Sequence, residues 1–136
     1  MDKVRVAMVA LGGYGNFYLA RLFGQAKPVS AEVVPFELVA GIDPNPSGCR
    51  YLEAFEATGV PIYPDLDAFY EKDMADLVVI AAPIQLHRPF TETALTHGSH
   101  VLCEKPVAVT IQAARAMAAA EAAAGRFVGV GYQWSY

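Results

Sequence analysis

The chain has 136 residues, is 54% hydrophobic and carries a formal net charge of −4, which fits one domain whose core needs no disulfide. Its lysines and arginines form no cluster and no apolar run approaches the roughly 18 residues of a membrane span, which argues against nucleic-acid and membrane partners. Cys49 and Cys103 match no metal-ligand spacing and no charged-then-apolar leader precedes the first strand, so we expect free thiols, no metal and a cytoplasmic location.

Strand and helix patterns alternate along the chain. Buried apolar runs predict strands at residues 4–11, 36–42, 61–63, 77–82, 101–103 and 127–132. The segments between them predict helices at residues 16–25, 47–58, 66–72, 89–97 and 110–124. This alternation is typical of a doubly wound α/β fold of the Rossmann type, in which helices cover both faces of a mostly parallel sheet. No linker divides the chain, so we expect residues 1–136 to form one domain.

The first predicted strand runs into a glycine-rich turn at residues 10–15, Ala-Leu-Gly-Gly-Tyr-Gly. This is a G-x-G-x-x-G pattern with alanine in place of the first glycine, and its order of strand, turn and helix is that of a dinucleotide site. Gly12 would let the backbone approach a diphosphate, and Gly15 would let helix and strand pack closely. We expect the phosphates of the cofactor to contact Gly12, Gly13, Tyr14, Gly15 and Asn16. Glycine turns after strands also serve simply to change direction, and Ala10 permits this turn if its φ is negative.

The second predicted strand ends at Asp43, where a carboxylate can accept hydrogen bonds from an adenosine ribose. It comes later than the usual spacing of about 20 residues, and a loop at residues 27–35 can absorb the excess. An aspartate before Pro44 is also a common turn former. A 2′-phosphate beside Asp43 would be repelled by about 4 kcal/mol at 4 Å and an effective dielectric near 20. No basic residue follows directly, and Arg50 lies several residues on, so the sequence predicts NAD, with NADP less favoured.

Residues 100–106, His-Val-Leu-Cys-Glu-Lys-Pro, run an apolar strand into a charged pair. Pro106 has no backbone N–H and biases Lys105 away from helix, so Lys105 should be extended at the carboxyl end of the strand. Ligands gather at such strand ends in α/β sheets, although a lysine there often only reaches water. The helix that follows should begin after Thr110 and end at Gly125 in the left-handed conformation.

Together these residues resemble a known family, the glucose-fructose oxidoreductase, inositol dehydrogenase and rhizopine catabolism family, written Gfo/Idh/MocA. The likeness to its N-terminal half runs nearly end to end. It rests on the glycine turn, the strand-end aspartate, residues 78–83 (Val-Val-Ile-Ala-Ala-Pro) with His87 four residues on, residues 100–106 and residues 130–133 (Val-Gly-Tyr-Gln).

The resemblance implies site residues that the sequence pattern alone does not. The nicotinamide half of the cofactor would lie near Ala82, Pro83, His87, Glu104, Lys105 and Gln133. By the same resemblance, Lys105 would be catalytic and would hydrogen-bond a substrate hydroxyl while hydride leaves carbon. Taken alone, His87 is also consistent with a residue at a helix start that packs against a loop.

The implied activity is that of an NAD(P)-dependent dehydrogenase acting on a sugar, polyol or related hydroxyl compound. The family fold continues into a second domain that supplies substrate contacts and often an oligomer interface, and this domain is absent from the chain. Two alternatives stay open, a free-standing NAD-binding sensor or subunit and a glycosidase-type relative that uses NAD transiently. Some residues depart from the family pattern. Tyr18 stands where the family commonly has histidine, and the pairs Ile84-Gln85 and Trp134-Ser135 also differ from the usual residues.

Overall fold

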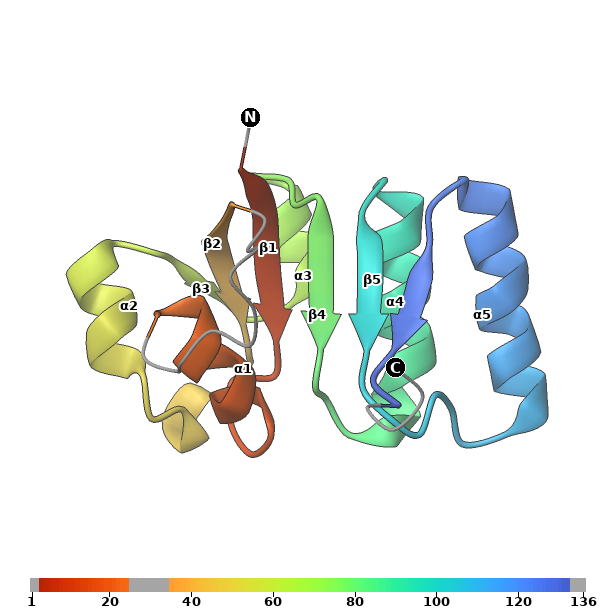
Figure 1. Ribbon diagram of the computed structural model, residues 1–136, viewed down its shortest axis with the longest axis horizontal. Helices are drawn as coiled ribbons and strands as arrows, with labels where there is room; N and C mark the ends of the chain where they lie inside the picture. The colour runs from red at the N-terminus through yellow and green to blue at the C-terminus, as the bar shows by residue number, and fades with distance from the viewer. Residues whose placement is uncertain (1–2, 25–34, 133–136) are drawn as a thin grey trace.

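The computed structural model describes residues 3–24 and 35–132, and within them the strands form one six-stranded sheet in the order β3-β2-β1-β4-β5-β6. Every strand pair in it is parallel. The strands are β1 (Val4–Val9), β2 (Phe36–Ile42), β3 (Ile62–Tyr63), β4 (Leu77–Ile80), β5 (His100–Cys103) and β6 (Val128–Val130). The chain order reverses between β1 and β4, which lie side by side (Figure 1). In open α/β sheets, ligands bind outside the carboxyl ends of the strands at such a switch point.

Helices cover both faces of this sheet, as the alternating pattern predicted. Figure 1 shows α1 and α2 on the near face and α3 and α4 behind, with α5 beside α4 beyond β6. The helices are α1 (Gly15–Leu22), α2 (Leu52–Thr58), α3 (Leu66–Tyr70), α4 (His87–Thr96) and α5 (Ile111–Ala124), with short 3-10 turns η1 (Pro46–Gly48) and η2 (Ile84–Leu86). In the described part of the chain, no helix is long and apolar enough to cross a membrane.

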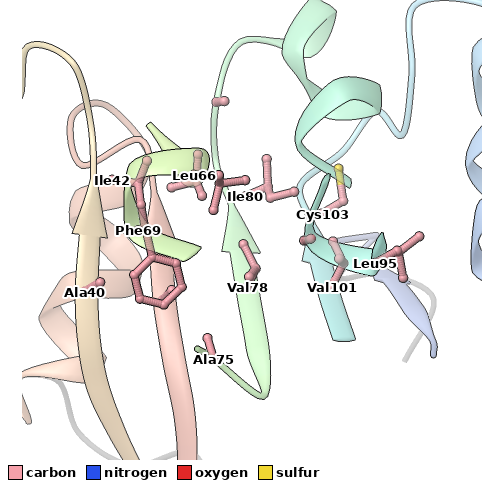
Figure 2. Close-up of a cluster of buried hydrophobic side chains, with 14 of the residues drawn as sticks. Ala40, Ile42, Leu66, Phe69, Ala75, Val78, Ile80, Leu95, Val101 and Cys103 are labelled. Atoms are coloured by element: carbon pink, nitrogen blue, oxygen red, sulfur yellow. The ribbon is translucent and has the colours of Figure 1, made fainter. Parts of the chain in front are cut away.

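Two buried clusters form the core, one on each face of the sheet. In β1, Met8 joins the cluster under α1 and α2, while Val9 joins the cluster under α3, α4 and α5. Successive strand residues point to opposite faces, so a sheet covered on both sides needs continuous apolar strands. Figure 2 shows the second cluster, in which Phe69 of α3 is fully buried among side chains of β2 and β4. Burial of one such side chain stabilises the fold by about 2 kcal/mol.

Both cysteines are free and buried, as predicted. Burial raises the pKa of the Cys103 thiol to about 12. A thiol with so high a pKa is almost entirely protonated at neutral pH and is therefore a poor nucleophile. Cys103 is a packing residue at the end of β5.

The predicted elements are confirmed, but several of their ends are shifted: most strands are shorter than predicted, while α1, α4 and β5 begin earlier. The first strand ends at Val9 and the fourth at Ile80, and the residues that follow them lie at the candidate site. The predicted helix at 47–58 is wrong in its first half, where η1 is followed by an extended Cys49 before α2 begins. The helix at 110–124 is confirmed with both caps, since Thr110 caps its start and Gly125 has φ +61°.

The cap at Thr110 yields a stability prediction. Its Oγ1 accepts a hydrogen bond from the Ala113 backbone N–H at 3.1 Å. Thr110→Ala leaves that donor without its partner, so the free energy of unfolding measured in urea should fall by about 1 kcal/mol. Thr110→Ser, which keeps the hydroxyl, should lose less than half as much. Equal losses in the two variants would show that the hydroxyl does not cap the helix.

Candidate functional site

The turn between β1 and α1 presents three backbone amides at the switch point of the sheet. Within the turn, the Gly15 N–H donates to the Gly12 carbonyl at 2.8 Å and the Asn16 N–H to the Gly13 carbonyl at 3.3 Å. Among the described residues, the amides of Gly12, Gly13 and Tyr14 have no hydrogen-bond acceptor. These three amides, rather than those of Gly15 and Asn16, are therefore the donors available to an anion at this helix end.

Ala10 corrects one detail of the sequence analysis. Its φ is +66°, so the turn forms with the alanine in the left-handed region rather than with a negative φ. That conformation costs an L-residue roughly 1 kcal/mol, and glycine adopts it freely. The same turn explains Gly15, because a Cβ added there would lie 2.0 Å from the Ala10 carbonyl oxygen. Helix α1 can start this close to the strand only with glycine at its first position.

Asp43 follows β2 and lies beside the glycine turn. Its Oδ2 accepts a hydrogen bond from the Leu11 N–H at 2.9 Å, and its Oδ1 accepts one from the Asn45 N–H at 2.9 Å. The second bond is the turn-forming role that the sequence left open, and the first ties the end of β2 to the glycine turn. A carboxylate has about four acceptor positions, so each oxygen keeps capacity for a further donor.

A cavity of about 280 Å³ opens between the strand ends beside Asp43. Its lining comes from the ends of β1, β2 and β4, from the loop after β3 and from η2 and α4. The lining residues are Val9, Ala10, Ile42, Asp43, Pro44, Pro64, Ala82, Pro83, Leu86 and Phe90. Of these, Pro64, Leu86 and Phe90 were not singled out in the sequence, because a single apolar residue in a turn or on a helix does not by itself indicate a cavity. The lining is apolar apart from one carboxylate and exposed backbone.

Glu104 is held at the end of β5 by three neighbours. Its Oε1 accepts the Tyr18 hydroxyl at 2.5 Å, and its Oε2 accepts the Lys105 backbone N–H at 3.0 Å. A Cβ added at Gly131 would lie 2.7 Å from Oε1, so the carboxylate also fills the space over that glycine. Burial and the adjacent Glu104 carboxylate raise the pKa of the Tyr18 hydroxyl, which therefore stays protonated as the donor. Tyr18, noted as a departure from the family pattern, links α1 to β5.

Lys105 is exposed next to this carboxylate, and its peptide bond to Pro106 is cis. No carboxylate of the described residues lies within 4.0 Å of its ammonium group. The side chain is thus available to a ligand at the carboxyl end of β5.

His87 is buried, with 1% of its surface exposed, at the start of α4. Its Nε2 lies 2.9 Å from the Ala82 carbonyl oxygen and its Nδ1 lies 3.0 Å from the Pro106 carbonyl oxygen. The imidazole therefore bridges the segment after β4 to the segment after β5. This position agrees with the second interpretation of His87 that the sequence left open, a histidine packed at a helix start. Ala82 and the exposed Pro83 lie beside it. Its ring reaches the site through these backbone groups rather than by facing solvent.

The structure brings these residues to one edge of the sheet, where the carboxyl ends of β1, β2, β4 and β5 meet the start of α1 (Figure 1). Gln133, the remaining candidate, lies outside the described residues. Within residues 3–24 and 35–132, no three His, Cys, Asp or Glu side chains gather in a way that could hold a metal ion.

Comparison with known proteins identifies the family to which the chain is similar. The model of the oxidoreductase family with an NAD-binding Rossmann fold, GFO_IDH_MocA, matches residues 4–132. Inositol 2-dehydrogenase from Rubrobacter xylanophilus is 31% identical over 136 residues, which is 99% of this chain and 37% of that protein. A putative UDP-kanosamine synthase oxidoreductase subunit from Amycolatopsis mediterranei is 33% identical over 90% of this chain and 32% of its own length.

Solved structures have the same fold. The WlbA dehydrogenase from Bordetella pertussis, in complex with NADH and UDP-GlcNAcA, superposes with a TM-score of 0.78 at 27% identity and covers 95% of this chain and 37% of that one. The myo-inositol 2-dehydrogenase from Lactobacillus plantarum superposes with a TM-score of 0.82 at 22% identity, a level that indicates the fold alone. The chain spans about two-fifths or less of the length of these proteins.

The close contact at Gly15 predicts the cost of filling it. Gly15→Ala places a methyl group 2.0 Å from a backbone oxygen, so the turn must shift. The free energy of unfolding measured in urea should therefore fall by about 2 kcal/mol or more. Gly13→Asn is the matched control, since Gly13 has φ +50° with no atom within 4 Å of an added Cβ, and asparagine tolerates that conformation. Equal losses in the two variants would contradict the proposed packing of α1 on β1.

Proposed function

The chain belongs to the Gfo/Idh/MocA oxidoreductase family, and we propose that it is the cofactor-binding half of an NAD-dependent enzyme that transfers hydride between a hydroxyl compound and the nicotinamide. The substrate class proposed is a sugar, a polyol or a related compound, in keeping with relatives named for inositol and nucleotide sugars. The observation that carries the proposal is the set of three free amides at the start of α1, opposite the Asp43 carboxylate. A free-standing NAD-binding subunit would share that site but would have no use for Lys105.

The diphosphate would lie at the start of α1. Three N–H groups without internal acceptors, from Gly12 to Tyr14, combine there with the positive end of the helix dipole. The adenosine ribose would then reach Asp43, whose two oxygens retain acceptor capacity. The apolar cavity beside Asp43 fits a flat adenine ring between prolines and aliphatic side chains.

Lys105 would act where the substrate meets the cofactor. Bound nicotinamide supplies the hydride acceptor or donor. In the oxidative direction, the carbinol hydrogen would leave with the C–H electron pair as hydride to the nicotinamide, and the hydroxyl proton would pass to solvent as the oxygen becomes a carbonyl oxygen. The Lys105 side chain, free of an internal carboxylate partner, would hydrogen-bond this oxygen and stabilise the negative charge that develops on it. Glu104 contributes by holding the Lys105 backbone N–H.

Binding of the cofactor tests the first half of the proposal. Calorimetric titration of this chain should give binding of NAD⁺ with one site, and NADP⁺ should bind at least about tenfold more weakly because the Asp43 carboxylate repels a 2′-phosphate. Asp43→Asn removes the charge and should narrow the difference between the two dissociation constants, most clearly at low salt. Tighter binding of NADP⁺ by the unaltered chain would contradict the proposed cofactor.

Substitution of Lys105 tests the catalytic role. Lys105→Met should leave the dissociation constant for NAD⁺ within about threefold, because the lysine does not contact the phosphates in this proposal. In any active form of the protein, turnover should fall by about a hundredfold or more. Lys72→Met, which alters an exposed lysine just after α3, is the matched control and should change neither quantity. Undiminished turnover in Lys105→Met would remove Lys105 from the mechanism.

A further inference from the structure

The loop between β2 and α2 offers almost no backbone hydrogen-bond donors to a ligand. We define the β2–α2 loop as residues 44–50, and its two prolines have no backbone N–H. The Asn45 N–H donates to the Asp43 carboxylate at 2.9 Å, and the Ser47 N–H donates to the Asn45 side chain at 3.4 Å. The Cys49 N–H donates to the Pro46 carbonyl at 2.9 Å. The loop that follows Asp43 therefore uses these backbone amides in internal hydrogen bonds.

The last amide of this loop is taken by Asn16, which lies in another element. The Arg50 N–H donates to the Asn16 Oδ1 at 2.8 Å. The Asn16 Nδ2 in turn donates to the Gly48 carbonyl at 3.1 Å and to the Gly13 carbonyl at 3.3 Å. With 8% of its surface exposed, Asn16 is the buried polar residue of α1 that fastens the β2–α2 loop to the glycine turn.

Backbone packing strengthens the same connection. A Cβ added at Gly12 would lie 3.5 Å from the Gly48 backbone, and one added at Gly48 would lie 3.5 Å from the Gly12 Cα. The loop thus lies in direct contact with the turn, and Asn16 holds it there with hydrogen bonds on both sides. A buried side chain whose donors and acceptor are all satisfied is a rigid link, and its removal leaves several backbone groups without partners.

We propose that Asn16 is a specificity-determining residue, which keeps the β2–α2 loop in the form that accepts an adenosine ribose with a free 2′-hydroxyl and rejects a 2′-phosphate. The inference rests on the proposed binding of NAD and adds a determinant besides the charge of Asp43. Sites that accept a 2′-phosphate place a cation and donors beside it. Here Arg50 is the cation in the loop, its backbone is fixed by Asn16, and among the described loop amides only Gly48 lacks an acceptor.

Two determinants of different physical kind can be separated by salt. The repulsion from Asp43 is electrostatic and weakens as ionic strength rises. The effect of Asn16 is one of geometry and hydrogen bonding, because the side chain carries no charge. A change in cofactor preference caused by Asn16 should therefore persist at high salt, whereas a change caused by Asp43 should shrink.

The test compares Asn16→Ala with the unaltered chain in calorimetric titrations with NAD⁺ and NADP⁺, at low and at high salt. Loss of the link should weaken NAD⁺ binding and should reduce the ratio of the two dissociation constants by about three- to tenfold, equally at both salt concentrations. Thr110→Ala, a destabilising variant at the cap of α5, is the control and should leave the ratio unchanged. An unchanged ratio in Asn16→Ala, or an equal change in Thr110→Ala, would overturn the inference.

A second measurement needs no variant. In the unaltered chain, the Arg50 amide should exchange with solvent deuterium at least about tenfold more slowly than the Gly48 amide, because Asn16 accepts from it. Exchange as fast as that of Gly48 would overturn the inference even if Asn16→Ala failed to fold. Failure of the unaltered chain to bind NAD⁺ would instead refute the proposed function. Binding of NAD⁺ with no effect of Asn16 would refute this inference alone.

Discussion

The contact between Gly15 and the carbonyl of Ala10 sets the geometry of the candidate site. Because a side chain at Gly15 would collide with that oxygen, the glycine allows α1 to begin directly against the end of β1. The start of the helix is thereby held at the switch point between β1 and β4, with three amides of the turn free of internal acceptors. Ala10 accommodates the turn in the left-handed region at a conformational cost, so this approach is maintained against local backbone preference.

Polar side chains then connect this turn and the neighbouring strand ends into one rigid edge. Each bond joins segments that are distant in sequence, and each involves a partly or fully buried group. The pairs are Asp43 with Leu11, Asn16 with Arg50, Tyr18 with Glu104, and His87 with Pro106. Such satisfied polar links fix the relative positions of loops that would otherwise move independently. A cofactor bound along this edge would therefore contact groups whose positions are already fixed in the free protein.

Sequence reasoning found the parts of the site that depend on local chemistry. Apolar runs located the strands, the glycine spacing located the turn, and Pro106 placed Lys105 at a strand end. The links across the site were missed, because 86 residues separate Tyr18 from Glu104 and no local pattern records such a pair. The bridging position of His87 was left as one of two alternatives for the same reason. The left-handed Ala10 was also missed, since residue type alone favours a negative φ there.

The central claim is that the amides from Gly12 to Tyr14 receive a diphosphate, and chemical-shift mapping of the ¹⁵N-labelled chain during titration with NAD⁺ tests it most directly. The account predicts that these three amide resonances move most and saturate together with those around Asp43, while resonances of the outer face of α5 stay in place. Saturating shifts elsewhere, with the Gly12, Gly13 and Tyr14 amides unmoved, would contradict it.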